Sequence, residues 1–203
     1  MFETRLRSRI DGVLIAGGRS RRFGADKRHA PFGSTSLAGR SLALLRACAD
    51  GEVFVAGRGA FERPAAVTFI EDAGFGAGPL GGLVAALLHA RAGVLVLPCD
   101  VPLLRQDTLS AVAALGRRSG RTVVARSSRG IEPLVAYYPR SALRQLAAGL
   151  REGNRALHRL LSRLAPLVVE AGSGGELANV NRPADLEAAA RLRQGHEDVR
   201  WAK

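Results

Sequence analysis

The stretch from Asp11 to Gly33, DGVLIAGGRSRRFGADKRHAPFG, decides how the rest of the chain is interpreted. It begins with an apolar run, Gly12 to Ala16, which stops at the paired glycines Gly17 and Gly18. An apolar run that ends at paired glycines predicts a buried strand leading into a tight loop. We therefore expect the fold to open with a strand and a glycine-containing loop.

A run of cations follows these glycines: Arg19, Arg21 and Arg22, and then, after Gly24, the pair Asp26–Lys27. Glycine lets several backbone N–H groups approach one ligand and point together, which makes a cradle for an anion. Arg22 and Lys27 would add the positive charge that a polyphosphate requires. A simple glycine turn with solvated arginines is the alternative. The combination of strand, glycines, cations and an Asp–Lys pair favours a phosphate site.

Two familiar glycine motifs do not fit this loop. The pattern G-x-x-x-x-G-K-S/T does not occur in the sequence, which excludes a Walker A loop. The positions of Gly17, Gly18 and Gly24 also fail to give G-x-G-x-x-G, so a dinucleotide-binding fingerprint is disfavoured. The phosphate site that we expect is therefore of another kind.

The size and composition of the chain predict one domain over residues 1–203, with residues 195–203 as a polar tail. The chain has 203 residues, of which 47% are hydrophobic, enough for a substantial core. No apolar run approaches the ~20 residues of a membrane helix. The charged N-terminus, MFETRLRSRI, is not followed by the long apolar segment of a signal peptide. We expect a cytoplasmic protein that has no membrane partner.

The net charge of +12 favours anionic partners. A nucleotide or a phosphorylated cofactor fits this charge better than nucleic acid, because aromatic residues make up only 5% of the chain and single-strand binders stack bases on aromatic rings. The two cysteines, Cys48 and Cys99, form neither a metal-binding spacing nor a disulfide framework.

Short apolar runs alternate with segments of helical periodicity along the chain. We expect strands at 12–16, 52–56, 67–70, 93–97, 122–126, 132–138 and 166–170, and helices at 36–49, 80–90, 105–118, 141–151, 156–164 and 183–193. Ser36 is a candidate N-cap, and Pro133 suggests an edge strand. The alternation indicates an α/β fold: a doubly wound, mostly parallel sheet with helices on both faces and a small excursion around residues 122–138.

Asp100 lies in the sequence PCDVP, directly after the continuously apolar strand expected at 93–97. An aspartate at the carboxyl end of a buried strand lies where open α/β sheets bind ligands. A carboxylate and a triphosphate repel each other unless a cation lies between them, and Mg²⁺ binds one or two carboxylates together with phosphate oxygens. Asp100 is therefore a candidate magnesium ligand, with a cap of the next helix as the alternative. Cys99 is expected to pack rather than to react.

These motifs together resemble a known family. The stretch LIAGGRSRRFGADK is similar to the signature loop of nucleotidyltransferases that build nucleotide-linked products from a nucleoside triphosphate. Among these enzymes it most resembles the molybdenum cofactor guanylyltransferases. Three later segments match that family in the same order: GPLGG at 78–82, PCDVP at 98–102 and NVNRPADL at 179–186. The resemblance therefore extends over nearly the whole chain.

The resemblance implies transfer of GMP from GTP to molybdenum-bound molybdopterin, with Mg²⁺ as cofactor and pyrophosphate as the second product. It also implies molybdoenzymes or cofactor-insertion proteins as further partners. Three residues would be catalytic: Lys27, Asp100 and Arg22. The nucleotide would contact Ile15, Ala16, Gly17, Gly18, Lys27, Asp72, Gly78, Pro79, Leu80 and Asp100. Asn179 and Asn181 would contact the second substrate, and Asp100 would hold the metal.

The sequence departs from the family pattern at two places. Ala56 stands where family members often have an asparagine that touches the nucleotide, which puts one contact in doubt. Arg28 and His29 replace the commoner small or apolar pair, and Arg28 is expected to add affinity for the anionic partner. Arginines 151, 155 and 159 form either a solvated face or a site for the pterin phosphate.

Two alternatives to the guanylyltransferase interpretation stay open. Within the same class, the substrates would be CTP or another phosphorylated acceptor such as a sugar phosphate. The segment GPLGG favours GTP, because the cytidylyl relatives carry a different segment there. In a different class, the protein would bind a nucleotide or deliver a cofactor without turnover. Lys27 and Asp100 argue against that class, because a delivery module has no need for a carboxylate that holds a metal.

Overall fold

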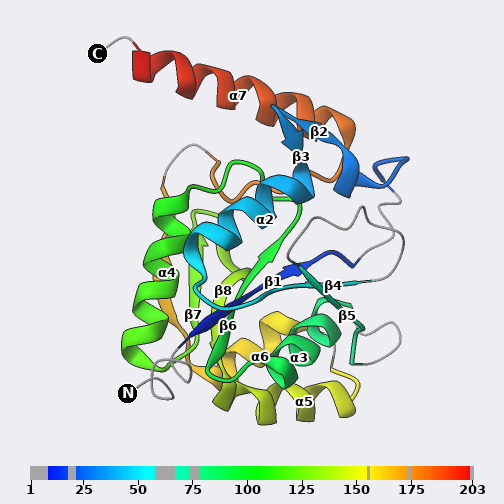
Figure 1. Ribbon diagram of the computed structural model, residues 1–203, viewed down its shortest axis with the longest axis vertical. Coiled ribbons are helices and arrows are strands. Elements are labelled where there is room, and N and C mark those ends of the chain that lie inside the picture. Colours follow the sequence, from blue (N-terminus) through cyan, green and yellow to red (C-terminus); the bar gives the residue numbers. More distant parts are fainter. Residues whose placement is uncertain are drawn as a thin grey trace.

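A seven-stranded sheet forms the centre of the computed structural model (Figure 1). The structure describes residues 9–17, 22–57, 67–73, 78–154, 156–172 and 175–201, with side chains as far as residue 194. The strands lie in the order β5-β4-β1-β6-β8-β7-β9. Helices cover both faces, which confirms the predicted α/β class with a doubly wound sheet.

One half of the sheet is parallel. It contains β1 (Ile10–Ile15), β4 (Val53–Ala56), β5 (Thr68–Ile70) and β6 (Gly93–Pro98). Every residue of β4 and β6 is buried, as expected for strands that are covered on both faces. Helix α2 (Leu37–Cys48) connects β1 to β4, and α3 (Pro79–His89) connects β5 to β6. These strands correspond to the first four that the sequence predicts, with ends that differ by one or two residues.

The other half of the sheet corrects the prediction for the segment around Pro133. Strand β8 (Gly130–Pro139) pairs antiparallel with both β6 and β7 (Val123–Ser127), so it is an inner strand and not an edge strand. The register of β7 and β8 shifts between Val124 and Ala125, which leaves Pro133 in a bulge. A bulge tolerates a residue without an N–H. The expected excursion is thus part of the main sheet, which ends at β9 (Leu167–Glu170).

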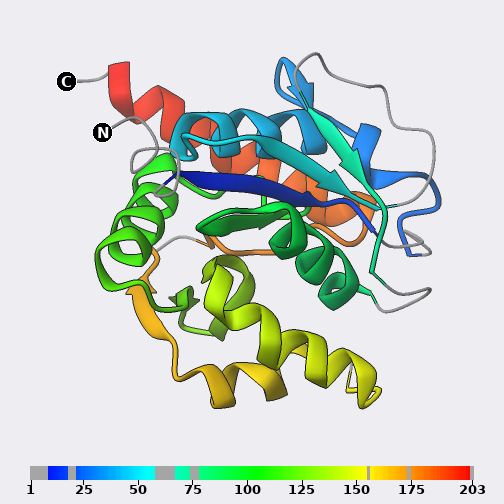
Figure 2. The same cartoon turned by 60° about the horizontal axis from the view of Figure 1, so that its bottom comes forward.

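The two faces of the sheet pack against different helices (Figure 2). Helices α2 and α4 (Gln106–Ser119) cover one face, where Leu14, Leu42 and Leu97 belong to one buried cluster. Helices α3, α5 (Leu143–Arg151) and α6 (Leu157–Leu164) cover the other face. Residues alternate between the two clusters along β1 because successive side chains of a strand point to opposite faces. The alternation produces two cores on one sheet.

A third, smaller core joins two parts of the chain that are far apart in sequence. Strands β2 (Pro31–Phe32) and β3 (Thr35–Ser36) form a hairpin, which the sequence did not predict. Phe32 is buried with Val180 and with residues of the last helix, α7, which spans Pro183–Trp201. This helix continues through most of the stretch predicted as a polar tail. Figure 1 shows α7 lying along the hairpin and the start of α2.

Local signals in the sequence explain several helix ends. The side chain of Ser36 accepts a hydrogen bond of 3.1 Å from the backbone N–H of Gly39, so the predicted N-cap of α2 is confirmed. Gly120 ends α4 in the left-handed region at φ 62°, where glycine carries no steric cost. Among the helices within the described ranges, none has the length and apolar composition needed to cross a membrane.

Gly116 allows α4 to lie close to the sheet, and its replacement by alanine tests this packing. A β-carbon at Gly116 would overlap the ring of Tyr137 on β8. We expect Gly116→Ala to lower the free energy of unfolding by about 1–3 kcal/mol, because the ring or the helix must move. Urea denaturation measures the change. Ala114→Gly, on the exposed side of the same helix, measures the difference in helix propensity between alanine and glycine where neither packs against the sheet. A Gly116→Ala variant that is more stable than the wild type would contradict the packing.

Candidate active site

The candidate site lies at the carboxyl ends of β1 and β6, which are neighbours in the sheet. Ile15, at the end of β1, pairs with Pro98, at the end of β6. The chain leaves β1 through α2 toward one side of the sheet, and it returns through α3 to the other side of β1. Ligands of open α/β sheets bind where the connections diverge in this way. The glycine loop and the PCDVP segment both begin at this place.

Lys27 connects three segments of the chain at this site. Its Nζ lies 2.8 Å from Asp100 Oδ2, 3.2 Å from Asn181 Oδ1 and 3.3 Å from the carbonyl oxygen of Val180. The side chains of Lys27 and Asp100 are 16% and 20% exposed, so the ion pair is largely shielded but still open to a ligand. The structure thus brings together a cation from the first loop, a carboxylate from the middle of the chain and a turn near its end.

Lysine suits this position better than arginine. Lys27 and Lys203 are the only lysines among the 30 lysine and arginine residues of the chain. An ammonium group is a compact charge with three donors, whereas a guanidinium is a wide planar fork. The three oxygens around Lys27, one from Asp100 and two from the turn at Val180 and Asn181, match the three donors of an ammonium group. Apart from Lys203, the other 28 of the 30 lysine and arginine residues are arginines, so the ammonium of Lys27 is a specific feature of the site.

Several contacts hold Asp100 in place, and sequence reasoning missed the residues that make them. The buried hydroxyl of Ser41 donates a hydrogen bond of 3.0 Å to the carbonyl of Pro98. The backbone N–H of Val180 donates to the carbonyl of Asp100 at 2.8 Å. Arg40 donates to the carbonyls of Pro102 and, at 3.3 Å, Leu104. In the sequence, Ser41 and Arg40 look like ordinary residues of α2, so no local pattern indicates these contacts.

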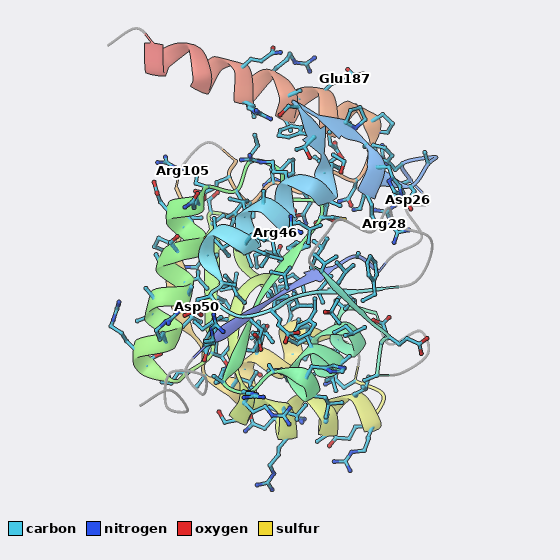
Figure 3. All side chains as sticks on the ribbon, viewed as in Figure 1. Asp26, Arg28, Arg46, Asp50, Arg105 and Glu187 are labelled. Atoms are coloured by element: carbon cyan, nitrogen blue, oxygen red, sulfur yellow. The ribbon has the colours of Figure 1, made fainter. Side chains whose placement is uncertain are left out.

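The residues next to Lys27 form a second ion pair (Figure 3). The Nε of Arg28 lies 2.8 and 2.9 Å from the two oxygens of Asp26, and its Nη1 donates to the carbonyl of Ala16 at 3.5 Å. The hydrogen bond from Arg28 holds the pKa of Asp26 below its usual range. Arg28 therefore ties the turn that carries Lys27 to the end of β1. The role expected for Arg28, added affinity for an anionic partner, stays a prediction.

The end of β1 departs from the expected phosphate cradle in one respect. Ile15 and Ala16 are buried, and the N–H of Ala16 donates to the carbonyl of Ala56 at 2.8 Å. That N–H is part of the sheet and is already used in a backbone hydrogen bond, whereas the contact expected between Ala16 and the nucleotide stays a prediction. Gly17 is exposed, and within the described part of the chain no atom beyond its chain neighbours lies within 4 Å of the position that a β-carbon would take. Gly18 lies outside the described residues.

The residues around α3 that are predicted to bind the nucleotide differ in how accessible they are. Asp72 follows β5 and lies beside the first turn of α3, where a β-carbon on Gly82 would be 3.2 Å from its Oδ1. Gly78, at φ 64°, precedes the helix, and Pro79 begins it. Leu80, in contrast, is fully buried in the core under the sheet. Its side chain cannot contact a base there, so only its backbone remains available to the nucleotide.

The remaining predicted residues lie on the surface. Arg22 and Asn179 are exposed, and no hydrogen bond or ion pair within the described part of the chain joins either of them to Lys27 or Asp100. Asn181 is exposed as well, but its amide oxygen contacts Lys27. Arg151 and Arg159 are exposed on α5 and α6, and Arg155 lies outside the described residues. The roles expected for these arginines and for Asn179 stay predictions.

Glu132 is a partly buried carboxylate on β8 that sequence reasoning did not single out. It lies next to the bulge, and its Oε1 accepts a hydrogen bond of 3.3 Å from the backbone N–H of Leu134. Burial, together with the negative charge of Asp100, raises the pKa of Glu132.

Cys99 is placed as a packing residue. Its side chain is 5% exposed, and burial together with the charge of Asp100 raises the pKa of its thiol to about 11. A thiol with this pKa is protonated at neutral pH and is a poor nucleophile. The structure thus gives Cys99 no feature of a reactive thiol, as the sequence predicted.

Comparison with known proteins identifies the family. A family model described as the MobA-like NTP transferase domain matches residues 12–167. The chain belongs to the MobA-like NTP transferase family. A relative of this transferase, "Probable molybdenum cofactor guanylyltransferase" of Opitutus terrae, is 34% identical over 91% of this chain and 96% of the relative. The resemblance inferred from the sequence is confirmed.

Two solved structures show the same fold as this MobA-like transferase. One is molybdopterin-guanine dinucleotide biosynthesis protein A of Archaeoglobus fulgidus, which is 23% identical over 92% of this chain and 100% of that chain, with a TM-score of 0.75. The other is Rv0371c of Mycobacterium tuberculosis in complex with manganese, 20% identical over 91% of this chain and 97% of that chain, with a TM-score of 0.63.

The donor set of this MobA-like transferase fits a divalent ion that is shared with a ligand. Among the described residues, no group of three or more His, Cys, Asp and Glu side chains could hold a metal ion. Mg²⁺, however, commonly uses one or two carboxylates and takes its other ligands from phosphates and water. Asp100 supplies one carboxylate at an open position, and the nearby oxygens of Val180 and Asn181 already surround a cation, the ammonium of Lys27. The oxygen-rich surroundings of Asp100 are therefore compatible with Mg²⁺.

The raised pKa of Glu132 predicts a pH-dependent contribution to stability. Because the folded state holds the proton of Glu132 more tightly than the unfolded state does, folded stability falls as the pH rises from about 4 through the raised pKa. Glu132→Gln removes this effect. We expect the melting temperature of the variant, relative to the wild type, to increase between pH 4 and pH 7.

Thermal unfolding at constant ionic strength measures this change. Glu187→Gln, at an exposed position of α7, is the control. The difference between its melting temperature and that of the wild type should stay constant from pH 4 to pH 7. A Glu132→Gln variant whose melting temperature follows that of the wild type at every pH would refute the raised pKa.

Proposed function

We propose that this protein transfers GMP from GTP to molybdenum-bound molybdopterin, giving molybdopterin guanine dinucleotide and pyrophosphate. Membership of the MobA-like NTP transferase family supports nucleotidyl transfer, and the name of the curated relative supports this acceptor. The observation that carries the proposal is the contact between Lys27 and Asp100 at the switch point of the sheet. A triphosphate bound there would meet an ammonium group and a carboxylate able to hold a metal.

In this reaction, a phosphate oxygen of the acceptor attacks the α-phosphate of GTP. The bond between the α-phosphorus and the bridging oxygen of pyrophosphate breaks as the new bond forms. Negative charge builds up on the departing pyrophosphate, so positioning and charge neutralisation account for most of the catalysis. Lys27 supplies a fixed positive charge at this position, and its contacts to Val180 and Asn181 limit the directions that its side chain can take.

Other residues of the chain would bind the nucleotide. The exposed backbone of Gly17, together with Gly18 and Arg22, would contact the phosphates. Asp72 and the backbone of residues 78–80 would hold the nucleoside against the first turn of α3. Asp100 would hold Mg²⁺ together with phosphate oxygens. When bound, Mg²⁺ would polarise the reacting phosphate and orient the leaving group.

The nucleotide is GTP in this proposal. The segment GPLGG forms the start of α3 at the carboxyl edge of the sheet, where its open backbone at Gly78 can approach a base. Asn179 and Asn181 flank Val180, whose N–H is bound to the carbonyl of Asp100, and they would contact the acceptor, with Asn181 also holding Lys27.

Removal of either charged group at the centre should slow turnover strongly. Loss of one charge-stabilising contact costs about 3–4 kcal/mol in the transition state, so we expect Lys27→Ala and Asp100→Ala to reduce kcat by a few hundred-fold. Lys27→Arg should recover little of this loss, because the guanidinium cannot meet three oxygens as the ammonium does. The measurement is pyrophosphate release with GTP, Mg²⁺ and molybdopterin, followed by mass analysis of the pterin product.

Asp107→Ala is the matched control, because its carboxylate is 84% exposed on α4 and contacts Arg105. Equal release of pyrophosphate with CTP, or with a sugar phosphate as acceptor, would replace the substrates proposed above. Tight binding of GTP without any pyrophosphate release by the wild type would instead support a delivery module. Near-normal turnover of both alanine variants would exclude Lys27 and Asp100 from the chemistry.

The proposed metal site has a test that does not depend on turnover. In the presence of GTP, Asp100→Asn should weaken the binding of Mn²⁺ by about tenfold or more, because an amide oxygen carries no charge. Electron paramagnetic resonance of free Mn²⁺ measures this affinity. Asp107→Asn should bind as the wild type does. An Asp100→Asn variant with unchanged affinity would show that the metal is held elsewhere.

A further inference from the structure

Asp185 lies in the first turn of α7 and holds the turn before that helix. Its Oδ2 accepts hydrogen bonds of 2.9 Å from the backbone N–H groups of both Asn181 and Arg182. These two bonds lower the pKa of Asp185, so that the carboxylate is charged at neutral pH. One carboxylate oxygen therefore determines the direction of two successive peptide groups.

The same turn supplies two of the three acceptors of Lys27. The carbonyl oxygen of Val180 and the side-chain oxygen of Asn181 lie on the side of the turn that faces the site. The N–H of Val180 is bound to the carbonyl of Asp100. The N–H of the peptide between Asn181 and Arg182 is bound instead by Asp185, at 2.9 Å.

Packing holds the position of the segment that runs from Val180 into α7. The hydrogen bonds of Asp185 act on a different property, the orientation of the peptide groups of Asn181 and Arg182. Val180 is 2% exposed and belongs to the third core with Phe32. On α7, Ala189 belongs to the same core, and the guanidinium of Arg193 lies 5.4 Å from the ring of Phe32. Hydrophobic and cation–π contacts of this kind locate the helix but do not direct a peptide group, whereas a hydrogen bond does.

We propose that Asp185 is a positioning residue for Lys27, acting through the turn at 180–182. The carboxylate holds the turn so that the oxygens of Val180 and Asn181 point at the ammonium, and these oxygens hold the ammonium beside Asp100. The catalytic consequence rests on the proposed function, but the effect on Lys27 itself does not.

A simpler role for Asp185 would be to cap α7, and the two roles predict different results. A cap changes the stability of the helix and leaves the surroundings of Lys27 as they are. A positioning residue changes how firmly the ammonium is held. Asp107, in the first turn of α4, is the control for the electrostatic part of a cap, because it also places a carboxylate near a helix N-terminus.

The first test is the reactivity of Lys27 toward an amine-selective reagent. Reductive methylation of the folded protein at limiting reagent, followed by peptide mass analysis, gives the rate at Lys27 relative to Lys203, the other lysine of the chain. We expect Lys27 to react about three- to tenfold faster in Asp185→Ala than in the wild type, as expected when one or two hydrogen bonds are weakened. Asp107→Ala should leave the ratio unchanged.

Asp185→Glu tests rescue, because a glutamate at this helix position can also reach back to the preceding N–H groups. It should return the reactivity ratio to nearly that of the wild type. Circular dichroism at the temperature of the reaction establishes that each variant is folded. An unchanged ratio in a folded Asp185→Ala protein would overturn the proposal and leave Asp185 as a cap.

The second test separates kcat from KM in GMP transfer. Asp185→Ala should lower kcat about tenfold with little change in KM for GTP, because a displaced Lys27 weakens an interaction made mainly in the transition state. An equal kcat of GMP transfer in Asp185→Ala and the wild type would overturn the proposal that Asp185 affects catalysis. If the wild type itself transfers no GMP, the proposed function fails, while the reactivity of Lys27 still decides the role of Asp185.

Discussion

The site is organised by one ammonium group that needs three oxygen acceptors. Lys27 takes one acceptor from the segment after β6 and two from the turn before α7. A partly shielded charge is costly unless such partners surround it. Every segment that contributes a partner must therefore reach the same point, and this requirement links the first loop, the middle strand and the last helix of the chain.

The sheet brings together the loop after β1 and the segment after β6. The third core brings the turn before α7 to the same place. Strands β1 and β6 are parallel neighbours, so the residues that follow them lie at the same edge. No strand carries the turn at 180–182 to that edge. It is held there by the bond from Val180 to Asp100 and by the packing of α7 on the hairpin of β2 and β3. The short hairpin therefore has a role in the site, although it lies outside the main sheet.

Local patterns in the sequence were sufficient to predict the strands of the main sheet, the main helices and the edge at which Lys27 and Asp100 meet, but not the hairpin of β2 and β3 or the full length of α7. Apolar runs without polar interruption predict strands covered on both faces, and parallel neighbours place their ends together. The inner position of β8 was not predictable in this way, because Pro133 is compatible with an edge strand and with a bulge alike. The roles of Ser41 and the N–H of Ala16 depend on contacts between distant segments, which leave no local pattern.

The bond from Val180 to Asp100 also has a consequence for the order in which the protein matures. During synthesis, the sheet can pair as far as β9 before the turn at 180–182 has left the ribosome. Until then, the ammonium has its carboxylate but lacks the two acceptors that the last segment brings. A nascent chain would therefore fold its scaffold first and acquire a finished centre only when the closing helix docks. Docking of α7 would thus complete the set of acceptors around the ammonium.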